Sequence, residues 1–377
     1  MEQNIISTNG RYEDADAWFD NMSKVMLVCD KSIIMHKIND YFETLFDRLG
    51  VGVIRFSDFS PNPLYESVVK GVKTFRENKC DAIIALGGGS AMDVAKCIKA
   101  YCFMNGDGDN GEWLKQEIEA NDIRFLAVPT TAGTGSEATR YAVVYYNGEK
   151  QSVTSETFIP DTVLMDSSIL KTLPVYFKKA TMCDALCHAI ESYWSVNSTD
   201  ESKEYSKNAI DCILKNMDGY ISNTEEGNAG MLLAANLAGK AINITQTTAG
   251  HAMCYKITSL FGLAHGHAAI LCDRILYSWM IDNVDRCSDP RGSKYLADTL
   301  DDIGIAMGCD NAKAGAKKLV DIFERLELEI PVASEQELVV LKKGVNPVRL
   351  KNHPIEMDEN TIDRLYHLIL NGDNYER

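Results

Sequence analysis

The chain has 377 residues, enough for two domains that each bury a sizeable core. Hydrophobic residues make up 45% of it and charged residues 24%, which is typical of a globular protein. The formal net charge of −16 argues against nucleic acid as the main partner, because phosphate backbones are bound by an excess of Lys and Arg. A small anionic ligand is compatible with this net charge, because its binding needs only a local positive site.

The first twenty residues are polar and acidic and lack the basic, apolar and small-residue regions of a signal peptide. No apolar run approaches the roughly 20 residues that span a bilayer. Eleven cysteines without a CxxC pair indicate a reducing compartment rather than a disulfide framework. We therefore expect a cytoplasmic protein with no membrane partner.

The first half of the chain alternates strand-like and helix-like segments. Strands are predicted at 24–32, 51–59, 81–90 and at the start of 124–137, and helices at 38–50, 65–78 and 91–104. Strands that alternate with helices predict a parallel sheet covered on both faces. We therefore expect a Rossmann-like α/β domain over residues 1–170.

Helical patterns dominate from about residue 170 to the end of the chain. The segment "GMLLAANLAGKAI" (230–242) is typical of them, and no strong strand pattern follows. These patterns predict an all-α domain over residues 171–377.

The segment "GGGSAMDVAK" (87–96) follows a strand and opens a helix. Consecutive glycines let the backbone approach a ligand closely, and the free N–H groups at a helix start favour phosphate. The segment matches neither GxGxxG nor the Walker pattern, so a plain tight connection is the alternative.

Two further features favour a dinucleotide. The loop "PTTAGTGSE" (129–137) is rich in small hydroxyl residues and leaves another strand, where ligand crevices form in parallel sheets. Asp30 ends the first predicted strand, where a carboxylate can accept hydrogen bonds from a ribose diol and repel a 2′-phosphate. The alternative role of Asp30 is a helix cap.

The segment "CDALCHAI" (183–190) places Asp184 and His188 one helical turn apart, on one face. A surface pair is the ordinary interpretation, but the surrounding segment is strongly apolar, and an unpaired buried carboxylate is costly. Two more imidazoles follow in "GHAMCYKITSLFGLAHGHAAI", at His251 and His265. One carboxylate and three imidazoles suit Fe(II), Zn(II) or Mn(II).

The motifs "GGGSAMDVAK", "PTTAGTGSE", "DALCHAIESYWS" and the spaced "GHAM…AHGHA" resemble those of the iron-containing (group III) alcohol dehydrogenase family. The likeness covers nearly the whole chain. It implies the dehydroquinate synthase-like architecture, with a Rossmann-like domain, a helical domain and a cleft between them. It also implies that Asp184, His188, His251 and His265 are ligands of one divalent ion, Fe2+ or Zn2+, with Mn2+ as a further candidate.

The resemblance assigns a cofactor site in the same way. It implies that the pyrophosphate of NAD(H) meets the glycine turn, that two residues support the helix start, and that three threonines line the nicotinamide side. These residues are, in that order, Gly87, Gly88, Gly89 and Ser90, then Asp93 and Lys96, then Thr130, Thr131 and Thr134. Asp30 favours NAD(H) over NADP(H).

In this family the metal polarises a carbonyl, and the nicotinamide transfers a hydride to its carbon. Many family members have a second histidine four residues after the position of His251, where this chain has Tyr255. We therefore expect Tyr255 or His267 to assist proton transfer.

Lys256 lies between two predicted ligands, so it is a candidate for binding a substrate that carries a strong anion, with His267 and Arg274 as helpers. A solvated surface charge is the usual fate of such a residue. The segment "HAMCYKITSLFGLAHGHA" is most similar to the phosphonoacetaldehyde reductase branch of the family. The predicted reaction is therefore NADH-dependent reduction of phosphonoacetaldehyde to 2-hydroxyethylphosphonate.

Four alternatives stay open. The substrate could be sulfoacetaldehyde, reduced to isethionate, or an uncharged short aldehyde. A lyase related to dehydroquinate synthase shares the architecture, and a non-catalytic NAD- or metal-binding module is the least specific interpretation. We also expect a homo-oligomer, most simply a dimer.

Overall fold

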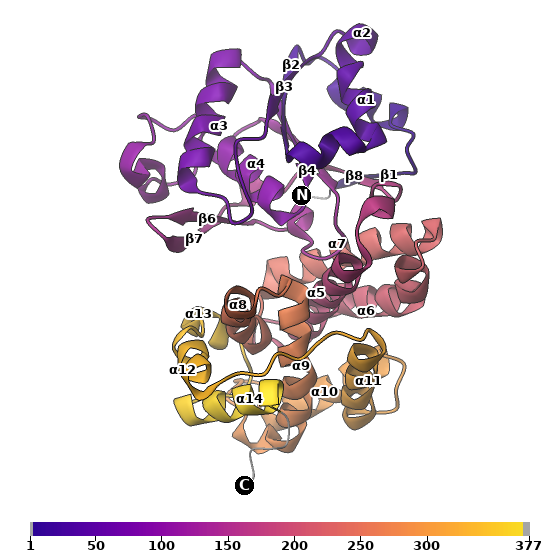
Figure 1. The fold of residues 1–377 in the computed structure, drawn as a ribbon, viewed down its shortest axis with the longest axis vertical. Helices are drawn as coiled ribbons and strands as arrows, with labels where there is room; N and C mark the ends of the chain where they lie inside the picture. Colours follow the sequence, from indigo (N-terminus) through magenta and orange to yellow (C-terminus); the bar gives the residue numbers. More distant parts are fainter. Residues whose placement is uncertain (1–2, 372–377) are drawn as a thin grey trace. The chain divides into compact units, whose positions relative to one another are not determined.

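The computed structural model describes residues 3–371, which form two compact units. Unit 1 comprises residues 1–173 and 222–232, and unit 2 comprises residues 174–221 and 233–377, within the described range (Figure 1). The predicted domains, 1–170 and 171–377, assign the segment 222–232 to the second domain instead.

Unit 1 is built on a six-stranded sheet. Its strands lie in the order β1-β8-β5-β4-β2-β3, and every neighbouring pair is parallel. The strands are β1 (Asn4–Thr8), β2 (Lys24–Cys29), β3 (Gly52–Phe56), β4 (Ala82–Gly87), β5 (Arg124–Pro129) and β8 (Thr162–Asp166). A separate antiparallel hairpin pairs β6 (Tyr141–Tyr146) with β7 (Glu149–Thr154).

Both faces of the sheet are covered, as the sequence predicts. On one face, alternate residues of β2 (Val25, Leu27 and Cys29) join a core with Tyr41 and Phe42 of helix α1 (Lys37–Glu43). Helices α3 (Tyr65–Asn78) and α4 (Gly89–Tyr101) pack on each other and on the sheet, and Figure 1 shows α1 and α3 on opposite sides of β2 and β3. Alternate residues join this core because the pleat of a strand directs successive side chains to opposite faces, and both faces of β2 are buried.

The elements predicted from periodicity are confirmed at β2, β3, β4, β5, α3 and α4. The continuous helix predicted at 38–50 is wrong, because Thr44 separates α1 from α2 (Leu45–Leu49). The Thr44 hydroxyl donates back to the carbonyl oxygens of Asp40 and Tyr41, which ends the first helix. Strands β1 and β8 and the β6–β7 hairpin were not predicted.

Three loops meet at the carboxyl edge of this sheet. Strand β2 ends before Asp30, β4 ends at Gly87, and β5 ends at Pro129, and these strands are neighbours in the sheet. Because parallel strands all end at the same edge, the three predicted nucleotide-binding segments lie together there.

Unit 2 is helical. Its helices are α5 (Val175–Trp194), α6 (Asp200–Ile221), the later part of α7 (Glu225–Thr245), α8 (Ala249–Phe261), α9 (His265–Asp282), α10 (Ser293–Ala306), α11 (Ala312–Arg325), α12 (Glu335–Lys343), α13 (Pro347–Leu350) and α14 (Glu359–Asn371). No strand occurs between residues 174 and 371 apart from an isolated bridge of Cys287 with Ile355. This result confirms the predicted fold class.

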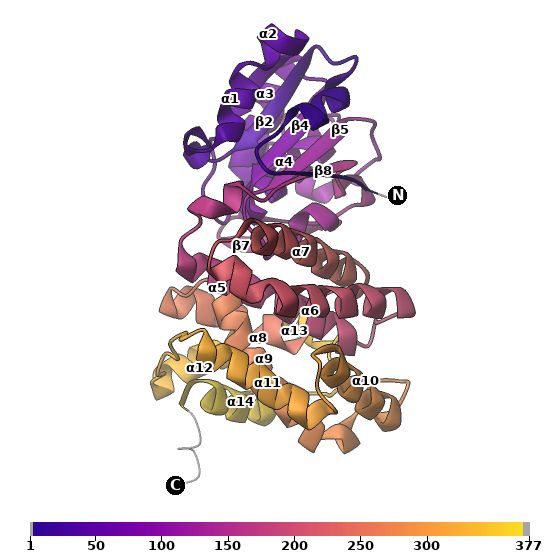
Figure 2. The same cartoon turned by 90° about the vertical axis from the view of Figure 1, so that its right-hand side faces the viewer.

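Helix α5 is the centre of unit 2. It packs against α6 and α9, and α8 packs on α9, so four helices are joined by packing (Figure 2). Fifteen of the twenty α5 residues are buried, which is why this helix is apolar on nearly all sides. Within residues 3–371, no helix combines the length and the apolar character that crossing a bilayer requires.

Candidate active site

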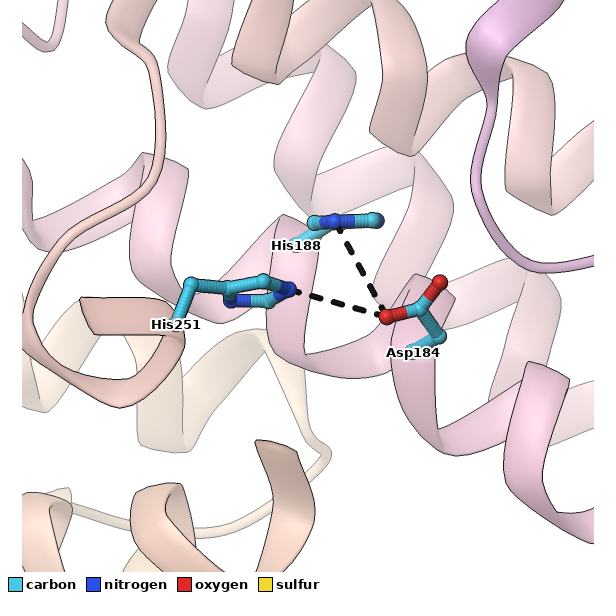
Figure 3. Close-up of side chains that lie close together, drawn as sticks. All are labelled: Asp184, His188 and His251. Atoms are coloured by element: carbon cyan, nitrogen blue, oxygen red, sulfur yellow. Dashed lines mark ion pairs between the residues drawn. The ribbon is translucent and has the colours of Figure 1, made fainter. Parts of the chain in front are cut away.

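Three side chains from two helices converge in the interior of unit 2. Asp184 and His188 lie one turn apart on α5, and His251 lies in the first turn of α8 (Figure 3). Their side chains are almost fully buried, and the His188 and His251 rings stack with centroids 4.5 Å apart. Asp184 and His188, which the sequence predicts to share one helix face, therefore both face His251, 63 positions after His188.

The fourth predicted ligand, His265, is the first residue of α9 and is more open to solvent. Its Nε2 atom lies 3.9 Å from Asp184 Oδ1, the same distance as His188 Nε2, while His251 Nε2 lies 3.6 Å away. Three imidazole nitrogens therefore point toward one carboxylate oxygen.

This arrangement fits a metal ion better than a hydrogen-bonded cluster. Asp184 Oδ1 and His251 Nε2 are buried and make no hydrogen bond with any residue of 3–371. Atoms bound about 2.0–2.2 Å from one ion at tetrahedral angles lie about 3.3–3.6 Å apart. Asp184, His188 and His251 offer ligand atoms that all lie within 4.8 Å of one another, and His265 Nε2 lies near Asp184 at 3.9 Å. The donor set, one carboxylate and three imidazoles, suits iron, zinc or manganese.

A buried glutamate fixes the orientation of His251. Glu191 is fully buried and accepts a hydrogen bond from His251 Nδ1, one from the His251 backbone N–H (3.0 Å) and one from the Thr248 hydroxyl (2.6 Å). With the Nδ1 proton directed at Glu191, the Nε2 lone pair faces Asp184, as a metal ligand requires. Sequence reasoning missed Glu191, although it lies seven residues after Asp184 and three after His188 on the same helix face.

The charges in this cluster compensate one another. Burial would raise the pKa of Asp184, but His188, His251 and His265 hold it well below its ordinary value. Burial also opposes ionisation of Glu191, yet the neighbouring His251 and Thr248 lower its pKa to about 2. Two ionised carboxylates in a buried site call for compensating positive charge, which a divalent ion supplies.

Two glycines make the close helix packing around the cluster sterically feasible. A Cβ atom on Gly266 would lie 2.0 Å from the Ala180 carbonyl oxygen and 2.6 Å from the Asp184 Cβ. A Cβ on Gly250 would lie 1.9 Å from an Asp273 carboxyl oxygen. Each of the predicted ligands His251 and His265 therefore has a glycine as its chain neighbour, Gly250 or Gly266, and that neighbour must be small.

Tyr255 and Lys256 lie one turn after His251 on α8. The Tyr255 ring stacks on the His265 ring, with centroids 5.4 Å apart and planes at 14°. Lys256 is half-buried, and its ammonium group makes no ion pair with any residue from 3 to 371. The structure therefore brings Tyr255 beside the ligand cluster, whereas Lys256 packs its aliphatic stem against Gly344.

His267 and Arg274, by contrast, are engaged in packing. His267 Nε2 lies 2.9 Å from the Glu329 carbonyl oxygen, to which it must donate, so Nδ1 accepts from the Tyr176 hydroxyl at 3.1 Å. Arg274 donates to the Ile369 carbonyl oxygen (2.8 Å) and lies over the Phe323 ring. A role of His267 in proton transfer stays a prediction, and it would require breaking one of these bonds.

The glycine turn of unit 1 lies against the threonine-rich loop. A Cβ on Gly88 would come within 3.4 Å of the Thr131 hydroxyl, and a Cβ on Gly89 within 3.5 Å of Thr134 Cγ2. Ser90 follows in the first turn of α4, and the Thr130 N–H donates to the Gly87 carbonyl oxygen (3.1 Å). The two loops thus lie side by side, with backbone and hydroxyl groups that fit a pyrophosphate.

Lys96 acts within the protein. It is fully buried, and its ammonium donates to the carbonyl oxygens of Ser136 (2.7 Å), Thr139 (2.9 Å) and Tyr141 (2.8 Å). Burial lowers its pKa to about 8, against the effect of nearby Asp93. Burial likewise raises the pKa of Asp93 to about 6. Lys96 therefore holds the second loop in place.

Asp30 serves as a helix cap, the alternative that the sequence left open. Its Oδ1 accepts from the Ser32 N–H at 2.7 Å and from the Ser32 hydroxyl. Its second oxygen lies 3.8 Å from where a Gly87 Cβ would stand, so the carboxylate adjoins the glycine turn. An exposed carboxylate at this place is compatible with both roles.

Comparisons with known proteins agree on the family of this chain. Residues 2–167 match the family profile "Iron-containing alcohol dehydrogenase", and residues 178–369 match "Fe-containing alcohol dehydrogenase family, C-terminal". Phosphonoacetaldehyde reductase of Streptomyces viridochromogenes is 31% identical over 266 residues, 67% of either protein.

Two crystal structures share the fold. Sulfoacetaldehyde reductase from Bifidobacterium kashiwanohense in complex with NAD+ gives a TM-score of 0.86 at 24% identity, over 99% of this chain and 97% of the other. The iron-containing alcohol dehydrogenase from Thermotoga maritima gives 0.81 at 26% identity, over 98% of each chain.

A parallel α/β unit and a helical unit with an Asp–His cluster define the dehydroquinate synthase-like class of enzymes. Within this class, the chain belongs to the iron-containing alcohol dehydrogenase family. It is an oxidoreductase that interconverts alcohols and aldehydes, which removes the support for a lyase or a non-catalytic module.

Proposed function

We propose that this enzyme reduces phosphonoacetaldehyde to 2-hydroxyethylphosphonate, with NADH as the hydride donor and one divalent ion held by Asp184, His188, His251 and His265. The observation that carries the proposal is the half-buried Lys256, five residues after His251, whose ammonium makes no ion pair within the described residues 3–371. In a chain of net charge −16, an anionic aldehyde meets a repulsive average field, so binding requires a local cation.

The cofactor assignment rests on unit 1. The backbone N–H groups of the glycine turn at the start of α4 suit a pyrophosphate, and the Asp30 carboxylate beside Gly87 favours a ribose diol over a 2′-phosphate. These two features together support NADH rather than NADPH.

The divalent ion, when bound, acts as a Lewis acid that polarises the aldehyde carbonyl. Glu191 keeps His251 in the tautomer that can bind the ion, and Lys256 holds the anionic end of the substrate. The reaction needs one hydride at the carbonyl carbon and one proton at its oxygen. We assign delivery of that proton to the hydroxyl of Tyr255, because its ring stacks on the ligand His265.

Steady-state kinetics with phosphonoacetaldehyde, sulfoacetaldehyde and propanal test the proposal. A charge-assisted contact is worth about 1.5–3 kcal/mol, so Lys256→Ala should lower kcat/KM for phosphonoacetaldehyde about tenfold to a hundredfold. Propanal should be nearly unaffected, and Lys343→Ala, which removes an exposed lysine of unit 2, is the matched control. Equal efficiency of the wild type on all three substrates would leave a general alcohol dehydrogenase. A preference for sulfoacetaldehyde would support the role of Lys256 in binding an anion but would change the proposed substrate to the sulfonate.

A further inference from the structure

Arg349 lies on the segment that packs against helix α8 next to Tyr255. The segment is tied to α8 by the Asn346 N–H, which donates to the Ala252 carbonyl oxygen (3.3 Å), and α13 packs on α8. The guanidinium adjoins the Tyr255 phenol. Burial raises the pKa of that phenol, Arg349 opposes the rise, and the result is about 12. A second cation therefore stands at the residue that stacks on the ligand His265.

Gln246 fixes the position of this guanidinium. Arg349 Nη1 donates to Gln246 Oε1 at 2.7 Å, and the same oxygen accepts from Asn352 Nδ2 at 3.3 Å. Gln246 itself has a φ of +61°, in the left-handed region, which residues with a side chain adopt only where their surroundings enforce it. An amide oxygen, unlike a carboxylate, orients an arginine without adding negative charge.

The same segment also seats Lys256. A Cβ atom on Gly344, which follows α12, would lie 2.9 Å from Lys256 Cγ and 3.2 Å from its Cδ. The absence of a side chain at Gly344 thus lets the aliphatic stem of Lys256 lie against the backbone. Residues 344–349 therefore contact both the stem of one cation and the phenol beside the other.

We propose that Lys256 and Arg349 together form the binding site for the anionic end of the substrate, with Tyr255 linking that site to the metal ligands. This inference rests on the proposed function and extends it to a choice between anions. A phosphonate that has lost both protons carries two negative charges, whereas a sulfonate carries only one. Two cations match the charge of the dianion, and the parallel N–H groups of an arginine guanidinium can donate to two of its oxygen atoms.

The test compares Arg349→Gln with the wild type, both loaded with metal and NADH. We expect kcat/KM for phosphonoacetaldehyde to fall about tenfold to a hundredfold, the value for sulfoacetaldehyde to fall less, and that for propanal to change less than about threefold. The inhibition constant of methylphosphonate, an unreactive phosphonate measured at alkaline pH where it is the dianion, should rise by a factor similar to that for phosphonoacetaldehyde. Arg349→Lys should restore part of the loss, because it keeps the charge without the fork.

Two further variants separate charge from position. Lys351→Gln removes an exposed positive charge two residues away and should leave all three substrates unchanged. Gly344→Ala keeps both charges but places a methyl group against the Lys256 stem, so it should weaken methylphosphonate inhibition while propanal reduction persists. Circular dichroism and thermal melting establish that each variant is folded.

The outcomes distinguish this inference from the proposed function. A wild type without preference for phosphonoacetaldehyde over propanal would overturn the proposed function and, with it, the basis for this site. A preference that is lost in Lys256→Ala but kept in Arg349→Gln would overturn the role of Arg349 alone. An equal loss on all three substrates in Arg349→Gln would show that Arg349 only supports the loop, which also contradicts the proposal.

Discussion

Replacing Glu191 with glutamine tests how much of the metal affinity comes from a residue outside the ligand set. The carboxylate is fully buried and accepts bonds from both the ring and the backbone of His251 and from Thr248. All of these partners are donors, so the amide NH2 of a glutamine would face at least one of them. The His251 ring would then lose the bond that fixes its tautomer.

The expected effect follows from that geometry. Partners that orient a metal-bound histidine typically contribute a factor of about 10–100 to metal affinity, equivalent to about 1.4–2.8 kcal/mol. A buried donor left facing an NH2 group costs a further 1–3 kcal/mol or so of folding free energy. We therefore expect Glu191→Gln to bind metal about 10–100-fold more weakly and to melt at a lower temperature, while staying folded.

Competition with a chromogenic chelator measures this affinity directly. The metal-depleted protein is titrated with zinc or iron(II) in the presence of the chelator, and circular dichroism verifies the fold. Glu204→Gln, at an exposed position on α6, is the matched control and should behave as the wild type. A folded Glu191→Gln protein with unchanged metal affinity would refute the reasoning.

Three other predictions concern the ligands, the cofactor and the pH response. His265→Ala should abolish metal retention, measured by elemental analysis, yet leave the melting temperature of the metal-free protein nearly unchanged, because its side chain is 35% exposed; full occupancy would contradict its assignment as a ligand. Asp30→Gly should lower the preference for NADH over NADPH by about tenfold in kcat/KM, and a wild type that favours NADPH would reverse this assignment. Burial lowers the pKa of His353 to about 3, so below its ordinary pKa the unfolded chain takes up a proton that the native state does not. Native stability should therefore fall as the pH drops from about 6.5 toward 3, by about 2 kcal/mol at pH 5 for this group. Urea unfolding of His353→Gln should show a weaker loss than the wild type, and an identical pH dependence would contradict the prediction.

Local patterns in the sequence were sufficient for the elements that carry the ligands and the glycine turn. Asp184 and His188 share a helix face because their spacing is one turn, and Gly87 to Ser90 follow a strand because the apolar run ends there. The helix that was predicted as continuous failed at Thr44, where one hydroxyl competes with the helical hydrogen bonds, an effect too local for periodicity to register.

Contacts between distant segments were decided by the tertiary structure. Strand β1 pairs with β8, which lies more than 150 residues later in the chain. Neither strand is apolar enough for its sequence to indicate which strand it pairs with. Arg349 meets Tyr255 only because residues 344–349 return to pack on α8, and Glu191 becomes a partner of His251 only once α5 and α8 pack together. Periodicity reports which face of an element is buried, whereas the identity of the facing residue depends on how the helices pack, which is a property of the whole core.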